Sequence, residues 1–154
     1  MIILKTNINN LGSLIKIANT LIEKKLNLRM NKLFAEYNLT GPQVTLLIYL
    51  YEAQERPVSQ KEVETVFFLS HPTTRSIVKR LTSKKLIISN PSDKDRRQMI
   101  LQLSKEGNKF ISTNITTIYQ NMDQINQKIT QNLTESNQGQ LIANLQQIIN
   151  NFQD

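Results

Sequence analysis

The sequence predicts a mainly α-helical protein with one small β-hairpin. Along most of the 154 residues, apolar side chains recur at three- and four-residue intervals, as on the buried face of an amphipathic helix. Two short β-prone stretches, residues 86–88 and 99–103, flank a polar loop and have the pattern of a hairpin. Compact domains mostly span about 50 to 200 residues, so we expect residues 1–154 to form a single domain.

Two helices are predicted in the first third of the chain. The first is unusually long, because its apolar pattern continues from Leu11 to Tyr37. We therefore assign the segment 8–38 to one helix. The second opens at Thr40, a capping residue, with a proline in the first turn and Gln43 placed to return the hydrogen bond. Its expected buried side comprises Val44, Leu47, Ile48, Leu50 and Tyr51.

A pair of helices joined by a tight turn follows a break at residues 55–57. Ser59 and Glu62 form a capping box that opens a short helix lasting to about Val66. After an apolar turn, Ser70 is placed to cap the next helix, which has a proline in its first turn. Together these elements have the pattern of a helix-turn-helix.

The helix that follows Ser70 is predicted to have one packing face and one polar, basic face. The packing face comprises Thr74, Ile77, Val78 and Leu81. The polar set at its start and on its outward side comprises Ser70, His71, Pro72, Thr73, Arg75, Ser76, Lys79 and Arg80. Between Ser70 and Arg97, eight basic side chains and two acidic ones give a net charge of +6, out of +7 for the chain. Such a surplus favours a polyanionic partner; an ordinary solvated basic face is the alternative.

A helix of this kind is suited to duplex DNA, because the major groove is about 12 Å wide and admits one helix. The first turn offers the hydroxyls of Ser70, Thr73 and Thr74, with the positive end of the helix dipole, for contacts with phosphate. Arg75 is placed to reach a guanine. At the other end, further contacts with the DNA backbone are expected from Lys84 and Lys85.

The loop between the two β-prone stretches carries three cationic side chains near its tip, Lys94, Arg96 and Arg97. On a hairpin beside a helix-turn-helix they are placed to enter an adjacent minor groove, attracted by its negative potential. Asp95 lies two residues before Arg97 and can hold that guanidinium through a bidentate ion pair. The loop is therefore predicted to be the wing of a winged helix-turn-helix spanning residues 40–103. A plain β-turn with exposed charges is the alternative.

Two more helices are predicted in residues 104–154. Ser104 caps the first, whose apolar residues alternate at intervals of four and three, as in a heptad seam: Ile111, Ile115, Ile118, Met122, Ile125 and Ile129. After a break near residues 133–136, the last helix carries Leu141, Leu145, Ile148 and Phe152 at similar spacing. These seams predict that the two helices pair with a second copy of the chain; packing within one chain is the alternative.

Several classes of function are disfavoured by what the sequence lacks. Without cysteine there is no disulfide or thiol sensor, and one histidine cannot form a multi-histidine metal site, so no cofactor and no metal are predicted. Glycine-rich phosphate loops and hydrolase motifs are missing, so we do not expect an enzyme. No apolar run approaches the ~18 residues of a membrane span, and Met1–Leu4 does not begin a secretory signal. We therefore expect a cytoplasmic protein with no membrane partner.

Two stretches carry a resemblance to a known family: L-S-H-P-T-T-R-S-I-V-K-R-L at 69–81, and the wing-to-helix stretch 93–107. With them, the chain resembles the multiple-antibiotic-resistance regulator (MarR) family over essentially its whole length. The resemblance implies a winged-helix DNA reader whose first and last helices, 8–38 and 104–154, form a two-fold dimer. It also implies that Arg97 enters the minor groove with Asp95 as its supporting acid. In one departure, Lys94 stands where the family's wing often has arginine.

The resemblance implies a sequence-specific transcriptional regulator, and we expect a homodimeric repressor that binds a near-palindromic operator. Family members commonly release DNA when a small molecule binds between the dimer helices and the winged helix. Residues expected to line that crevice are Met30, Phe34, Tyr37, Tyr49 and Tyr51. A small aromatic or phenolic ligand, such as an aromatic acid, would suit their aromatic walls and a nearby cation; ordinary core packing is the alternative. The alternative function is a non-specific or architectural DNA-binding or protein-interaction module.

Overall fold

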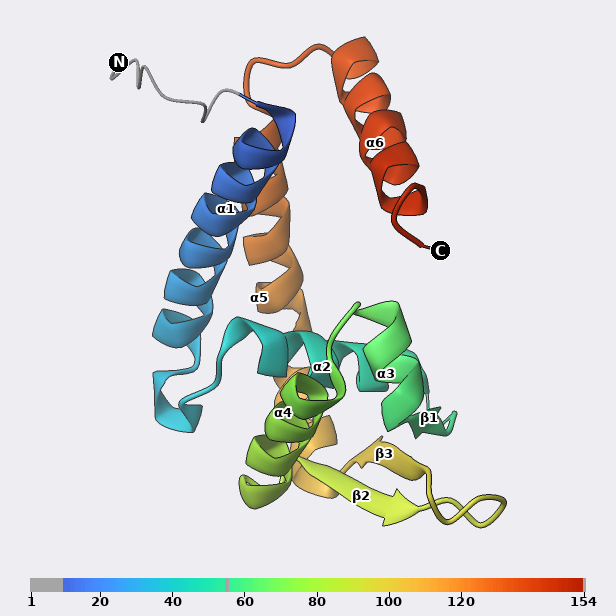
Figure 1. Ribbon diagram of the computed structural model, residues 1–154. Helices are drawn as coiled ribbons and strands as arrows, with labels where there is room; N and C mark the ends of the chain where they lie inside the picture. Colours follow the sequence, from blue (N-terminus) through green and yellow to red (C-terminus); the bar gives the residue numbers. More distant parts are fainter. Residues whose placement is uncertain (1–9, 55, 154) are drawn as a thin grey trace.

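The structure, a computed structural model, describes residues 10–54 and 56–153 (Figure 1). Its helices are α1 (Leu11–Leu33), the short 3-10 helix η2 (Ala35–Tyr37), α2 (Gly41–Glu52), α3 (Gln60–Val66), α4 (His71–Ser83), α5 (Lys105–Thr130) and α6 (Glu135–Asn150). Within the described residues, β1 (Val58–Ser59), β2 (Ile87–Pro91) and β3 (Met99–Leu103) form an antiparallel sheet in the order β1-β3-β2. Residues 1–9, 55 and 154 lie outside the described residues; they include the stretch 1–4, Glu55, the start of the predicted range 8–38, the end of 104–154 and both ends of 1–154.

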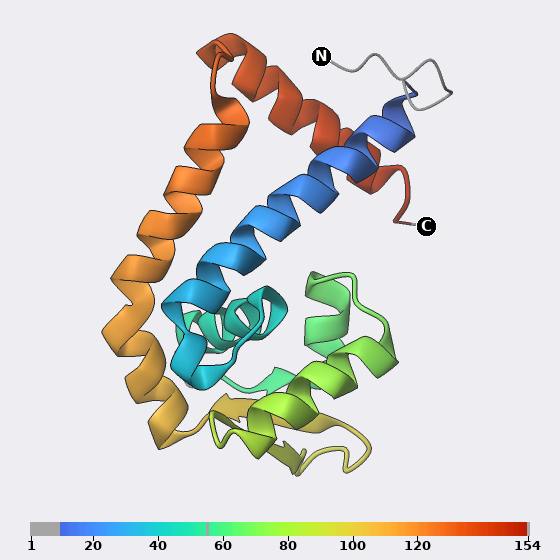
Figure 2. The same ribbon diagram turned by 90° about the vertical axis from the view of Figure 1, so that its left-hand side faces the viewer.

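A winged-helix unit, residues 41–103, occupies one end of the molecule and a helical frame the other. Figures 1 and 2 show that α1 and α5 run away from the winged-helix unit, and that α6 turns back from the far end of α5. Both α1 and α5 pack against α2, which joins the frame to the unit. The predicted fold class, mainly α with a small hairpin wing, is confirmed.

The core lies where α2, α4, α5 and the sheet meet. Each of these elements contributes a side chain with no exposed surface: Leu47 from α2, Leu81 from α4, Leu101 from β3 and Ile111 from α5. Burial of one such side chain is worth about 1.5 to 3 kcal/mol. The recognition-type helix α4 and the sheet are therefore held against α5 by shared apolar packing.

Helix starts follow the predicted capping residues. The backbone N–H of Thr40 donates to the side chain of Gln43 at 3.1 Å. The Ser59 hydroxyl accepts the Glu62 N–H at 3.0 Å, and that of Ser104 accepts the Gly107 N–H at 2.9 Å. These bonds satisfy backbone donors that a first helical turn leaves without a partner.

The first helix ends earlier than predicted. The α-helix stops at Leu33 and the chain continues as η2, so the predicted continuation to Tyr37 is wrong. Phe34 and Tyr37 pack instead against Phe110 of α5, with ring centroids 5.1 and 4.5 Å apart. Contacts of this kind between distant segments are not visible in the apolar spacing of one helix.

The sheet also differs from the prediction. The first arm of the hairpin, expected at 86–88, extends through Pro91, which pairs with Met99. Proline lacks a backbone donor but is tolerated there because β2 is an edge strand. The two-residue strand β1, not predicted, places Val58 opposite Leu101.

The apolar seam of α5 is divided between the chain's own core and its surface. Ile111, Ile118 and Ile125 are buried within the chain, whereas Met122 and Ile129 are exposed. The expectation that the whole seam needs a partner copy is therefore wrong for these three isoleucines, because α5 packs within the chain against α1, α2 and β3.

The last helix contrasts with α5. All residues of α6 are described and none is buried. The predicted seam residue Phe152 lies beyond its end and is 86% exposed. Among the described helices, none combines the length and apolar character needed to cross a membrane.

Candidate nucleic-acid interface

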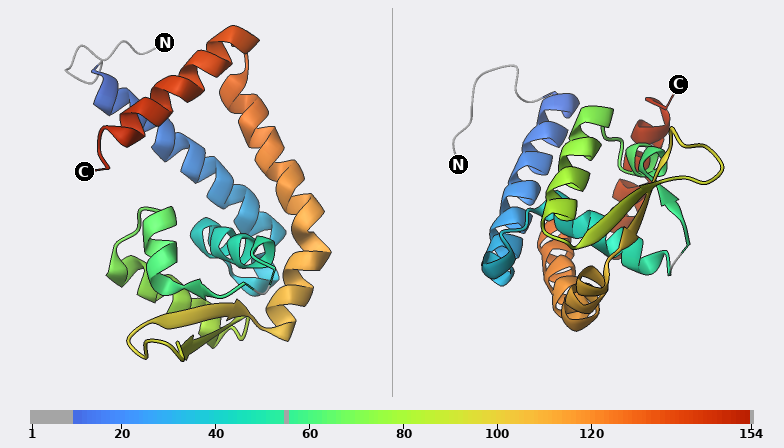
Figure 3. Two further views of the ribbon diagram at one scale, coloured as in Figure 1. Left: turned by 90° about the vertical axis from the view of Figure 1, so that its right-hand side faces the viewer. Right: turned by 90° about the horizontal axis from the view of Figure 1, so that it is seen from below.

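The polar face of α4 is exposed, as predicted, while Thr74, Val78 and Leu81 are buried beneath it. The exposed side chains are those of Ser70, His71, Pro72, Thr73, Arg75, Ser76, Lys79 and Arg80. In the right-hand view of Figure 3, from below, α4 lies beside the β2–β3 hairpin, and α4 contacts β2. The structure therefore brings the predicted helix and wing residues to one side of the molecule.

Hydroxyl groups organise the first turn of α4. The Ser70 hydroxyl accepts the Thr73 N–H at 3.3 Å and lies 2.8 Å from the Thr73 hydroxyl. Thr74 was expected to offer a third hydroxyl to phosphate, but it is 0% exposed and donates to the Ser70 carbonyl at 3.2 Å. That expectation is wrong because residue 74 belongs to the packing face, one helical turn before Val78.

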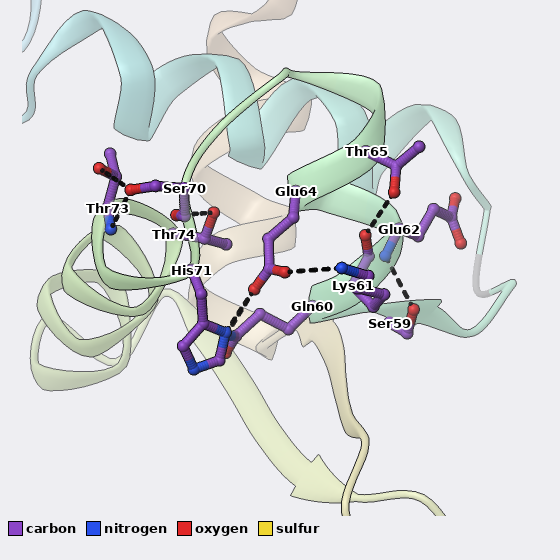
Figure 4. A network of polar contacts seen from close by, with 10 residues as sticks. All are labelled: Ser59, Gln60, Lys61, Glu62, Glu64, Thr65, Ser70, His71, Thr73 and Thr74. Atoms are coloured by element: carbon purple, nitrogen blue, oxygen red, sulfur yellow. Dashed lines mark hydrogen bonds and ion pairs between the residues drawn. The ribbon is translucent and has the colours of Figure 1, made fainter. Parts of the chain in front are cut away.

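Three polar side chains join α3 to the start of α4 (Figure 4). Nδ1 of His71 lies 2.7 Å from Oε1 of Glu64, and the Gln60 amide donates to the same oxygen at 3.2 Å. These hydrogen bonds, Gln60 first and His71 second, lower the pKa of the Glu64 carboxyl below its ordinary value. A carboxylate between the two helices therefore stays ionised and fixes the imidazole.

The wing is a tight loop stabilised by Asp95. Its carboxylate accepts the Arg97 backbone N–H at 3.1 Å and the guanidinium through Nε at 3.1 Å and Nη2 at 3.5 Å. These bonds hold the pKa of Asp95 below its ordinary range. The predicted ion pair is confirmed, and the Arg97 side chain is still 92% exposed. Arg96 and Lys94 are exposed beside it.

The two lysines after α4 differ in their contacts. Lys84 extends its ammonium group to the carbonyl of Tyr37, at 2.8 Å, and so ties the end of α4 to η2. Lys85 adopts a left-handed backbone conformation, with φ of 59°, and its side chain is exposed. Contact of both lysines with DNA stays a prediction, and for Lys84 it requires breaking or sharing the bond to Tyr37.

A pocket of about 260 Å³ lies between α1 and the helices of the winged-helix unit. Its lining combines Leu26 and Asn27 of α1 with residues of α2, α3 and α4, among them Thr45, Val63 and Ile77. Among the described residues that line it, Glu23 is the one charged side chain. The lining therefore offers no cation to pair with the carboxylate of an aromatic acid.

The five residues predicted to line an effector crevice do not come together in this pocket. Met30 and Phe34 belong to the core. Tyr37 stacks on Phe110, and Tyr51 lines a separate hollow beside β3. Tyr49 packs on Phe67 and donates to the Glu62 carboxylate at 2.6 Å, which raises the pKa of the Tyr49 hydroxyl. Apolar spacing placed Met30 on the first helix and Tyr49 and Tyr51 on the second, as in the structure, but it could not show which side chains face the pocket.

Two sets of candidate residues were missed from the sequence. Gln60 and Glu64 have the i, i+4 spacing that places two side chains on one face of a helix. This spacing could have predicted that the two side chains interact. The pocket residues Leu26, Asn27 and Thr45 carried no such signal, because their proximity depends on how α1 crosses α2.

An exposed basic helix after a tight turn, followed by an arginine-tipped hairpin, defines the winged helix-turn-helix class of proteins. A sequence model described as the MarR family matches residues 37–98. The transcription regulator MarR from Oenococcus oeni PSU-1 is 30% identical, over 92% of this chain and 99% of that one, with a TM-score of 0.69. The chain therefore belongs to the MarR family, whose members are DNA-binding transcription regulators and not enzymes.

Two further relatives are similar in different ways. The HTH-type transcriptional regulator MgrA of Staphylococcus aureus is 36% identical over 74 residues, which are 48% of this chain and 49% of MgrA. The match thus spans about half the length of this curated relative. The structure of an S. aureus MepR–DNA complex superposes with a TM-score of 0.77 over 93% of this chain and 98% of MepR, at 21% identity. That likeness shows the shared fold.

Proposed function

We propose that this chain is a cytoplasmic, sequence-specific regulator that binds duplex DNA as a homodimer and represses transcription. The observation that carries the proposal is the exposed basic face of α4 beside a wing whose Arg97 is held by Asp95. The DNA complex of MepR, which has the same fold, supports it. In this arrangement α4 enters a major groove and the wing an adjacent minor groove.

Exposed apolar side chains on the helical frame support the homodimer. On α1 they are Leu11, Leu14, Ile17 and Leu21, on α5 Met122 and Ile129, and on α6 Leu141, Ile142, Leu145 and Ile149. A single chain leaves these residues in water, and a two-fold partner would cover the same set on both copies. The two α4 helices would then meet half-sites about one DNA turn apart, on a near-palindromic operator.

The pocket between α1 and the winged-helix unit supports release by a small molecule. A ligand there would contact α1, which belongs to the frame, and Ile77 of α4, which would bind DNA. Filling the pocket changes the spacing of those two elements, and hence the spacing of the two α4 helices in a dimer. The proposed effector is small and largely apolar, aromatic or phenolic, and the Glu23 carboxylate in the lining disfavours an anion.

Selection from a randomised duplex library, followed by fluorescence anisotropy, tests the DNA proposal. The wild-type chain is expected to select a near-palindrome and to bind it at least ~10³-fold more tightly than random duplex, with affinity falling steeply as salt rises. Equal competition by random duplex would instead support the alternative, a non-specific or architectural module.

Three single variants test the placement of the DNA contacts. Arg75→Ala is expected to relax preference at one base pair by about 1 to 3 kcal/mol. Arg97→Ala is expected to weaken binding most where the flanking sequence is A·T-rich and its minor groove narrow. Lys128→Ala removes one charge near the far end of α5 and is the matched control, expected to change affinity little. Unchanged affinity in folded Arg75→Ala and Arg97→Ala proteins would contradict the placement.

A further inference from the structure

A nearly buried carboxylate lies directly behind the first residue of α4. The Glu64 side chain is 9% exposed, and its Oε1 is 2.7 Å from Nδ1 of His71. Gln60 Nε2 lies 3.2 Å from the same oxygen, and the Lys61 ammonium lies 3.7 Å from Oε2. Figure 4 shows Glu64 of α3 between the imidazole of His71, at the start of α4, and the ammonium group of Lys61.

These contacts determine where the neutral imidazole carries its proton. An ionised carboxylate only accepts hydrogen bonds, so the nitrogen that faces it, Nδ1, must be the donor. Gln60 Nε2 is also 3.3 Å from Nδ1, but it is an amide donor and cannot accept the Nδ1 proton in place of Glu64. The other ring nitrogen, Nε2, is then left with a free lone pair.

The free nitrogen lies on the exposed side of the ring. The His71 side chain is 64% exposed, and in Figure 4 its second nitrogen is turned away from Glu64. In the major groove, the exocyclic amino groups of adenine and cytosine are hydrogen-bond donors, whereas guanine and thymine present acceptors. An Nε2 acceptor can therefore bond to adenine or cytosine and is repelled by the acceptors of guanine and thymine.

We propose that His71 is a specificity-determining residue that reads an amino-bearing base, adenine or cytosine, and that Glu64 is a positioning residue that sets its tautomer. The inference rests on the proposed function, since it requires α4 in the major groove. Glu64 thus affects the base preference through His71, although the Glu64 carboxylate lies behind the imidazole.

Nitrogen-15 NMR of the histidine ring tests the tautomer without DNA. His71 is the one histidine of the chain, so labelling histidine yields the spectrum of a single ring. At pH 8.5 the wild-type protein is expected to show a protonated Nδ1 and an unprotonated Nε2. In Glu64→Leu the ring is expected to shift towards the Nε2-protonated form. A wild-type ring protonated at Nε2, or a folded Glu64→Leu protein with an unchanged spectrum, would overturn the inference.

Substitution of single base pairs in the selected duplex tests whether His71 recognises adenine or cytosine. His71→Ala is expected to lose about 3- to 10-fold preference for adenine or cytosine at one position of each half-site, the size of a single hydrogen bond. Glu64→Leu is expected to lose the same preference, whereas Lys79→Ala should weaken all duplexes alike. Because His71 is exposed, its variant decides the question even where Glu64→Leu does not fold.

Two negative outcomes are distinguishable. Wild-type protein that selects no sequence overturns the proposed function and the base reading with it. Wild-type protein that selects a sequence, with His71→Ala keeping every base preference, overturns this inference alone.

Discussion

At the level of single residues, Gly107 marks a close approach between α5 and the turn after α4. It lies in the first turn of α5, and a Cβ atom added there would come within 1.8 Å of the Leu86 carbonyl oxygen. The Leu86 carbonyl belongs to the backbone and cannot move aside as the end of a flexible side chain can. Only glycine therefore fits between α5 and the turn after α4.

Gly107→Ala is expected to lower the free energy of unfolding by about 2 kcal/mol or more, because the added methyl group forces the two backbones apart. Gly139→Ala is the matched control: nothing lies within 4 Å of the added Cβ, and alanine favours the helix by about 0.5 to 1 kcal/mol. Urea unfolding followed by circular dichroism measures both. A Gly107→Ala protein as stable as wild type would contradict the close approach.

Glu62 is a second residue whose contribution to stability can be measured separately, through its dependence on pH. Hydrogen bonds from Arg56 and Tyr49 reach its carboxylate, and the bond from Arg56 is the main cause of its lowered pKa. A carboxyl whose folded-state pKa is lowered stabilises the fold above its ordinary value of 4.5, and loses that effect as pH falls through the lowered value.

Glu62→Gln is therefore expected to reduce the urea midpoint at pH 7, with the difference from wild type shrinking at pH 3.5. Glu36→Gln, at an exposed glutamate of η2, is the control and should change the midpoint little at either pH. A Glu62→Gln difference that is the same at both pH values would show that the carboxylate's charge is not what stabilises this cluster.

At the level of elements, α5 depends on its N-cap residue, Ser104, more than α6 depends on its own, Thr134. The hydroxyl of Ser104 accepts the Gly107 N–H and also donates to the Lys85 carbonyl at 2.5 Å, in a nearly buried position. Thr134, at the start of α6, makes one exposed capping bond, to the Asn137 N–H at 3.2 Å. Ser104 thus joins α5 to the turn after α4 as well as capping it.

Ser104→Ala is expected to cost about 2 kcal/mol, because a cap is lost and a buried carbonyl loses its donor. Thr134→Ala, the matched change at an exposed cap, is expected to cost about 0.5 to 1 kcal/mol. Thermal unfolding of the two variants, measured side by side, checks the difference. Equal costs would mean that the bond to Lys85 adds nothing.

At the level of the whole molecule, the helical frame is the part that a single chain leaves incomplete. Leu145, on the exposed apolar face of α6, is expected to lie in the proposed dimer interface. Leu145→Asp should shift sedimentation equilibrium from dimer towards monomer and weaken binding to a palindrome more than to one half-site. Asn144→Asp adds the same charge at the neighbouring exposed position and is expected to leave the dimer intact. A wild-type protein that sediments as a monomer at micromolar concentration would contradict the dimer.

The sequence alone determined the features that depend on residues a few positions apart. The caps at Ser70 and Ser104, the buried and exposed faces of α4, and the Asp95–Arg97 pair were all predicted, because each arises within about four residues. Helical and hairpin patterns of this kind need no knowledge of the rest of the chain.

Only the tertiary structure decided which surfaces meet. It buried Ile111, Ile118 and Ile125 within the chain, gathered the pocket beneath α1, and brought Glu64 of α3 against His71 of α4. Apolar periodicity shows that a face must be covered but not by which partner, because the covering element is chosen by packing between segments distant in sequence. For this reason the basic helix and the wing were foreseen, while the carboxylate behind His71 was not.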